Sequence, residues 1–164
     1  MRDAVISFRA VQDADDLARL ETALRALSAD IAEDYSTDSA ILTQALQGAQ
    51  PAAYGLLALG GDQTLGAALY SPVFSTVRGA AGVYVSDLWV SEKARGQGLG
   101  AGLMAQVAQA GVARWQASWL KLAVYDHSEN AQAFYQRLGF APARGMQEMR
   151  LGPQGVATLI KGAE

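Results

Sequence analysis

The feature that most constrains the fold is a glycine-rich junction between an apolar segment and the longest helical pattern of the chain. Residues 83–90 are mostly apolar and typical of a buried strand, and residues 98–115 carry apolar side chains at helical spacing. Gly96, Gly98 and Gly100 stand at this junction, where they let the backbone approach an anion without interference from a Cβ atom. The start of a helix adds unpaired N–H donors and a partial positive charge. The junction therefore predicts a seat for a phosphate or pyrophosphate group.

Comparison with two known phosphate-binding motifs restricts which kind of ligand this junction can bind. A nucleotide P-loop needs a lysine and then a Ser or Thr after its last glycine, and neither follows Gly100. The segment from Gly96 to Ala101 does match the GxGxxG/A pattern of dinucleotide-binding folds. However, five residues separate the strand from Gly96, and Lys121 stands where that fold places an acidic residue. Nicotinamide-dependent redox chemistry therefore remains only as an alternative class.

The hydrophobic periodicity predicts alternating strands and helices along the whole chain. Strands are predicted over residues 5–9, 53–59, 64–74, 83–90, 120–125 and 146–151. Helices are predicted after Asp13, over Ser39–Gln47, over residues 98–115 and over residues 130–138. The order is β-α-α-β-β-β-α-β-α-β, with an antiparallel hairpin early and parallel neighbours across each helix. We expect one α/β domain with a mixed sheet over residues 1–164.

The composition excludes several kinds of chemistry. The chain has 164 residues, no cysteine and one histidine, so thiolate metal sites and cysteine nucleophiles are excluded and no metal site is expected. A formal net charge of −3 gives no electrostatic support for a nucleic-acid partner. No apolar run approaches the roughly 18 residues that a membrane helix needs. A cytoplasmic protein without a membrane partner is the expectation.

Two motifs resemble signatures of the GNAT family of N-acetyltransferases. Arg95, Gly98 and Gly100 match the acyl-CoA signature (Q/R)xxGxG/A. A second signature follows downstream as Asn130-Ala131-Gln132-Ala133-Phe134-Tyr135-Gln136-Arg137-Leu138-Gly139-Phe140. The resemblance covers nearly the whole chain, and its finer likeness is to the diamine and polyamine acetyltransferase branch. It implies a GNAT-like fold with splayed central parallel strands, and family members often form homodimers.

The resemblance implies direct transfer of an acetyl group from acetyl-CoA to a primary amine of a small molecule, in which a cationic or polyamine-like acceptor is one option. The pyrophosphate would rest on the N–H groups of residues 95–101, and the pantetheine arm would pair with the strand edge at residues 88–90. The Val90 N–H would polarise the thioester carbonyl. The implied cofactor-binding residues are Leu88, Trp89, Val90, Arg95, Gly96, Gln97, Gly98, Leu99, Gly100, Ala101, Asn130 and Tyr135.

The catalytic groups follow from the same resemblance, each with an alternative structural role. Tyr135 would protonate the leaving thiolate, or it packs as an ordinary helix aromatic. Asn130 would bond the pantetheine arm, or it caps its helix. Ser86 stands where the polyamine-like branch has a glutamate base, and the carboxylate of Asp87 follows it. Because adjacent strand residues face opposite ways, Asp87 replaces that base only if a bulge redirects it. A water-relayed base, or binding of a substrate ammonium by Asp87, remains an alternative.

The acceptor side is predicted from an acidic segment, residues 30–38, which holds four carboxylates and Tyr35. Asp34, Tyr35 and Asp87 are the expected substrate-binding residues, because carboxylates near a cleft attract a cationic amine. A merely solvated charged segment is the alternative. Two other functions stay open: acetylation of a protein or peptide amine, and a non-catalytic acyl-CoA-binding module, which Ser86 in place of the expected glutamate keeps plausible.

Overall fold

The computed structural model describes residues 5–163, and the chain divides into two compact units, Met1–Tyr125 and Asp126–Glu164. The first unit contains the whole sheet and the glycine-rich junction. The second contains two short helices. The single domain over residues 1–164 stays a prediction.

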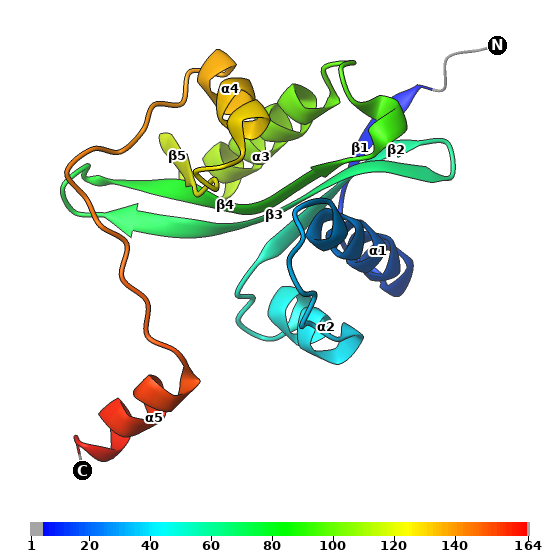
Figure 1. The fold of residues 1–164 in the computed structure, drawn as a ribbon. Coiled ribbons are helices and arrows are strands. Elements are labelled where there is room, and N and C mark those ends of the chain that lie inside the picture. The colour runs from blue at the N-terminus through cyan, green and yellow to red at the C-terminus, as the bar shows by residue number, and fades with distance from the viewer. Residues whose placement is uncertain (1–4, 164) are drawn as a thin grey trace. The chain divides into compact units, whose positions relative to one another are not determined.

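The first unit is built on a five-stranded mixed sheet in the order β1-β2-β3-β4-β5 (Figure 1). The strands are β1 (Ile6–Ala10), β2 (Tyr54–Gly60), β3 (Gln63–Ser75), β4 (Ala80–Val90) and β5 (Trp119–Leu122). The first four strands pair antiparallel, and β4 pairs with β5 in parallel. The predicted mixed α/β class is therefore confirmed, although β4 starts earlier, at Ala80, and β5 ends at Leu122 rather than at residue 125.

Helices cover both faces of this sheet. They are α1 (Ala14–Asp30), α2 (Ser39–Gln47), the short 3-10 turn η1 (Glu92–Ala94) and α3 (Leu99–Trp115). Asp13 and Asp38 cap the first two helices, because each side chain accepts a hydrogen bond from an N–H of the first turn. The helices α1 and α2 lie on one face, called here the α1 face, and α3 lies on the other (Figure 1).

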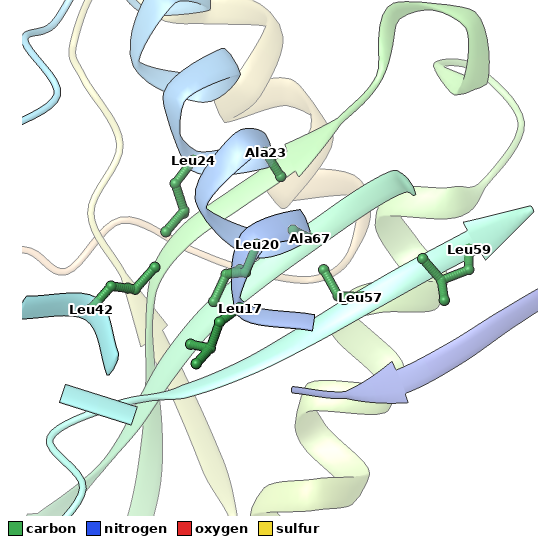
Figure 2. Packing of buried hydrophobic residues seen from close by; sticks show 8 residues of the cluster. All are labelled: Leu17, Leu20, Ala23, Leu24, Leu42, Leu57, Leu59 and Ala67. Atoms are coloured by element: carbon green, nitrogen blue, oxygen red, sulfur yellow. The ribbon is translucent and has the colours of Figure 1, made fainter. Parts of the chain in front are cut away.

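The α1 face holds a leucine-rich core between α1, α2 and the central strands. Its members are Leu17, Leu20, Ala23, Leu24, Leu42, Leu57, Leu59 and Ala67 (Figure 2). The helical members recur every three or four residues, so one stripe of α1 enters the core. Burying each leucine stabilises the fold by about 1.5–3 kcal/mol. This core fixes α1, and therefore the acidic segment that follows it, against the sheet.

The opposite face is packed by the buried side of α3. Leu99, Leu103 and Val107 are buried there. Gly111 lies so close to Val83 of β4 that a Cβ atom would collide with the valine side chain. The glycine is therefore what allows α3 to approach β4 closely. This packing holds the beginning of α3, and with it the glycine-rich junction, at the end of β4.

The second unit contains α4 (Glu129–Arg137) and α5 (Pro153–Lys161). Gly139, with φ of 94°, follows the end of α4. The N–H of Phe140 donates to the carbonyl of Tyr135 at 3.0 Å, and the N–H of Gly139 donates to the carbonyl of Gln136 at 2.9 Å. These two bonds define a Schellman motif, which ends the helix at a glycine as its sequence predicted.

The predicted closing strand over residues 146–151 is wrong. The segment forms no strand, and its apolar residues Met146 and Met149 are 78% and 88% exposed. These two methionines are three residues apart, so they cannot share one face of a strand, where the period is two. The next element is α5, which the sequence analysis did not assign although Pro153 stands in its first turn. The element order therefore ends in a helix.

Candidate functional site

The outer edge of β4 is open beyond its pairing with β5. The two strands pair only from Gly82 to Val85, whereas β4 continues to Val90. The N–H of Ser91 donates to the carbonyl of Leu65 at 2.8 Å, so this group points toward β3. Because N–H groups alternate along a strand, those of Leu88 and Val90 point the other way, toward the open edge. This is the splay that the family resemblance implies between these two strands, and it leaves donors for an extended ligand.

The glycine-rich loop presents bare backbone at the start of α3. Gly96 and Gly98 have φ of 76° and 78°, and a Cβ atom added to either would meet nothing within 4 Å. Gly98 is the N-cap of α3, with no side-chain cap. The first helical bond runs from the N–H of Gly102 to the carbonyl of Gly98, so the three N–H groups between them have no acceptor within the helix. Open space over left-handed glycines and unpaired amides fits a pyrophosphate.

A bulge in β4 decides where Asp87 points. In the pairing with β3, Leu69 lies opposite Asp87, but Tyr70 lies opposite Val85, so Ser86 is an extra residue. Leu69 packs against the α1-face core, whereas Tyr70 contacts Trp115 of α3. Cross-strand partners share a face of the sheet. Asp87 therefore lies on the α1 face, although Val85, two residues earlier, lies on the other. A bulge, without which Asp87 could not take the position of the expected base, is therefore present at Ser86.

The environment of Asp87 suits proton transfer. Burial raises the pKa of its carboxyl above the ordinary value of 3.8, and a hydrogen bond with the Ser86 side chain opposes this shift in part. Burial penalises the charged carboxylate, so the group holds its proton to a higher pH than an exposed aspartate does. Ser86 is exposed, and its hydroxyl donates to the carbonyl of Leu69 at 3.2 Å. The serine thus fixes the bulge beside the carboxylate.

Tyr35 lies on the same face as Asp87. It packs against the α1-face core, and its ring lies under the guanidinium of Arg25, 4.4 Å from the ring centre. Its hydroxyl oxygen is buried and has no partner among the described residues. Desolvation, and then the charge of Glu21, raise the pKa of the Tyr35 phenol, and the charge of Asp87 adds to this. A buried hydroxyl without a partner is uncommon and is consistent with a ligand position. Asp34, the third expected acceptor residue, is exposed.

Arg95 and Trp89 point toward the last residue of α1. The guanidinium Nη2 of Arg95 and the indole Nε1 of Trp89 both donate to Oδ2 of Asp30, at 2.6 Å and 3.2 Å. The Nε of Arg95 donates to the carbonyl of Val90 at 3.0 Å. Sequence reasoning placed Asp30 only in an acidic segment. No local signal could have linked it to Arg95, because 65 residues separate the pair.

The other predicted loop residues have mainly local roles for their side chains. The amide of Gln97 donates to the carbonyl of Lys93 at 2.8 Å, which folds this side chain back on η1. Leu99, the first residue of α3, is buried. The part of residues 96–101 that remains for a ligand is therefore the main chain, and binding of the pyrophosphate there stays a prediction.

Asn130 and Tyr135 lie in the second unit, on α4. Asn130 is in the first turn of the helix, and Ser128, not Asn130, occupies the N-cap position. The Tyr135 ring contacts Phe134 and Phe140, with ring centroids 5.0 Å and 5.7 Å apart. Asn130 therefore does not cap the helix at its N-cap position, and Tyr135 has the aromatic packing that was its alternative role. Their predicted functional roles remain predictions.

Across residues 5–163, no group of three or more His, Asp or Glu side chains is placed to hold a metal ion. None of the helices described is both long enough and apolar enough to cross a membrane. The glycine loop and the open edge of β4 are thus the features on which the candidate site rests.

Comparison with known proteins now places this arrangement in a class. A family model described as "Acetyltransferase (GNAT) family" matches residues 17–140. A comparison with curated proteins finds no match. Among solved structures, an integron cassette protein from the mobile metagenome of V. cholerae superposes with a TM-score of 0.77, at 22% identity, covering 95% of this chain and 98% of that one.

Two further solved structures have named activities. The ribosomal-protein-alanine N-acetyltransferase of Brucella melitensis has a TM-score of 0.70 at 18% identity, covering 90% of this chain and 100% of that one. An aminoglycoside N-acetyltransferase solved in complex with CoA has a TM-score of 0.74 at 16% identity, covering 92% of this chain and 97% of that one.

The fold and the match identify an acyl-CoA-dependent class of transferase. The chain belongs to the acetyltransferase (GNAT) family, since the family model spans most of its length. The resemblance found in the sequence is thereby confirmed at the level of the family. The likeness to the diamine and polyamine branch remains a prediction.

Proposed function

We propose that this protein transfers the acetyl group of acetyl-CoA to a primary amine of a small cationic molecule. The observation that carries the proposal is the bulge at Ser86, which puts Asp87 on the α1 face beside the open edge of β4. If Asp87 acts as a base on the α1 face and the acetyl-CoA thioester lies along the open edge of β4, the two groups would meet near the end of this strand. The acidic segment after α1 supports a cationic acceptor.

The chain supplies a proton acceptor for the amine and a proton donor for the leaving thiolate. Asp87 takes a proton from the ammonium, and the free amine then attacks the thioester carbonyl to form the new C–N bond. The N–H of Val90 donates to the carbonyl oxygen as negative charge develops on it. The nitrogen of the tetrahedral adduct then loses its second proton to solvent water as the C–S bond breaks. The departing thiolate would take a proton from the Tyr135 hydroxyl, and the tyrosinate would regain that proton from solvent. Asn130 would orient the pantetheine arm.

The test is acetyl-CoA turnover with three acceptors: spermidine, the aminoglycoside sisomicin and a peptide with an N-terminal alanine. Released CoA is measured with a thiol reagent, which meets no protein background because the chain has no cysteine. Turnover with spermidine or sisomicin supports the proposal. Turnover with the peptide alone would favour a protein or peptide acceptor. Binding of CoA without any turnover would favour a binding module. A homodimer stays a prediction, which a measurement of molecular mass in solution tests. A cytoplasmic location also stays a prediction, which cell fractionation tests.

The Asp87→Asn variant is expected to lower kcat by about 10²–10³-fold, the usual contribution of a general base. In the native protein, activity should fall as the pH drops through the raised pKa of Asp87, because the protonated carboxyl cannot accept a proton. The variant should lose this acidic limb of the profile of kcat against pH. An unchanged profile would remove Asp87 from the mechanism. The matched control is Asp62→Asn in the β2–β3 hairpin, which should leave kcat unaltered.

The same variant should be more stable at neutral pH. Because the folded pKa of Asp87 lies above its unfolded value, the folded state binds more protons between the two, and stability falls as the pH rises through that window. Asparagine carries no charge and avoids this loss. We expect the Tm of Asp87→Asn to exceed that of the native protein at pH 7 and to match it more closely near pH 3.

A further inference from the structure

Asp30, the last residue of α1, joins two parts of the site that are distant in the sequence. Its Oδ2 accepts hydrogen bonds from Arg95 and from Trp89. Arg95 in turn donates from its Nε to the carbonyl of Val90, at the end of β4. These contacts form a clasp, defined by Asp30, Trp89, Val90 and Arg95, between the end of α1 and the end of β4.

The clasp connects the α1 face with the open strand edge. Trp89 lies opposite Ala67 and packs against the α1-face core, so its bond places the Asp30 carboxylate on that face. The carbonyl of Val90 shares the direction of its N–H and therefore points to the open edge. The guanidinium of Arg95 touches both. A planar guanidinium that binds on two sides fixes its partners relative to each other more firmly than a flexible ammonium would.

Stability alone does not account for this arrangement. The side chains of Arg95 and Asp30 are 53% and 44% exposed. An ion pair with that much exposure contributes from nothing to about 1 kcal/mol, because water screens it. The bond to Val90 instead holds the strand residue whose N–H points to the open edge. The main effect of the clasp is therefore to fix the position of Val90 relative to α1, and its contribution to the free energy of folding is small.

Asp30 is the first residue of the acidic segment, residues 30–38, and its hydrogen bonds hold the beginning of that segment in place. Glu33 is bonded to Tyr125 at 2.9 Å after β5, and Asp38 caps α2. Between these anchors lies Tyr35, with its buried and unpartnered hydroxyl. Asp30 thus links Arg95 and the end of β4 to the segment that carries Tyr35.

We propose that Asp30 is a positioning residue that couples the acetyl-CoA edge of β4 to the acceptor segment, residues 31–38. This inference rests on the proposed function, since it takes the edge and the loop as the acetyl-CoA site. Binding of coenzyme A at residues 95–101 sets the position of Arg95, and Asp30 passes that constraint to residues 31–38. The charge of Arg95 is neutralised by Asp30, so main-chain amides rather than this guanidinium supply most of the attraction for the pyrophosphate.

The experiment follows amide hydrogen exchange by mass spectrometry, with and without coenzyme A, and needs no knowledge of the amine. In the native protein, coenzyme A should slow exchange about threefold or more both in residues 95–101 and in residues 31–38. In Asp30→Ala, the effect on residues 95–101 should persist, whereas the effect on residues 31–38 should be lost. In Asp30→Asn, which removes the charge but keeps the shape, the effect on residues 31–38 should be reduced.

The matched control is Asp15→Ala, which removes another aspartate–arginine pair from α1. Asp15 bonds Arg19 at 2.8 Å on the exposed side of the helix. Coenzyme A should protect both segments in this variant. A purely structural role for Asp30 would change exchange equally with and without coenzyme A.

Two results would overturn the inference, and they are distinguishable. Protection of residues 95–101 without protection of residues 31–38 in the native protein, or protection of both in Asp30→Ala, would refute the coupling and leave the proposed function standing. The absence of any protection at residues 95–101 in the native protein would refute the proposed function together with the coupling.

Discussion

Gly98→Val is expected to weaken the binding of coenzyme A by about 100-fold or more. Gly98 has φ of 78°, and its Cα faces open space at the start of α3. A valine there would lie in the position of the pyrophosphate and would push the backbone from its left-handed conformation. Loss of two charge-assisted hydrogen bonds at about 1.5 kcal/mol each corresponds to a Kd weakened by about 100-fold or more. Calorimetric titration of the variant and of the native protein with coenzyme A measures the two Kd values.

The control for this variant must carry the same backbone strain elsewhere. Gly79, with φ of 62°, also faces open space, but it lies in the turn between β3 and β4. Gly79→Val should lose a similar stability, about 1–2 kcal/mol from the left-handed conformation, and keep native affinity for coenzyme A. Equal affinity in Gly98→Val and the native protein would show that the pyrophosphate does not lie at this loop.

Tyr135→Phe is expected to lower kcat by about 10²–10³-fold while leaving the Kd for coenzyme A within about twofold. Phenylalanine keeps the ring contacts with Phe134 and Phe140, so the fold of α4 should be unaffected. Only the hydroxyl proton for the leaving thiolate is lost. The measurement is turnover under saturating acetyl-CoA with the best acceptor from the panel.

A matched tyrosine tests whether the loss is specific. Tyr54 belongs to a second aromatic cluster, in which its ring contacts Tyr70 and Trp115. Tyr54→Phe should have native kcat and a similar small change in Tm. If Tyr135→Phe retains full activity, the tyrosine has the packing role alone, and the thiolate is protonated by solvent or by another group.

The local sequence predicted the elements whose signals are local. Asp38 and Gly48 bracket α2 at the predicted ends, because a capping carboxylate and a glycine act within one turn of the helix. Gly98 is the N-cap of α3, and its signal is also local because it acts within the first turn of that helix. The wrong strand over residues 146–151 and the unassigned α5 show the limit of such signals. The three apolar residues of 146–151 do not keep the period of two that a strand requires, whereas Pro153 is a local start signal for α5.

The candidate site likewise has some features with local sequence signals and others that depend on contacts between distant residues. The glycine loop, the strand before it and the family signature are contiguous in the chain, so the sequence alone determined the family and predicted an acyl-CoA loop at the start of α3. The face taken by Asp87 was undetermined, because a bulge depends on how β4 registers against β3. The contact between Asp30 and Arg95 was equally hidden, since it forms only when α1 packs on the sheet. Capping and turn chemistry act over a few residues, whereas register and packing depend on partners far along the chain, and only the tertiary structure brings these together.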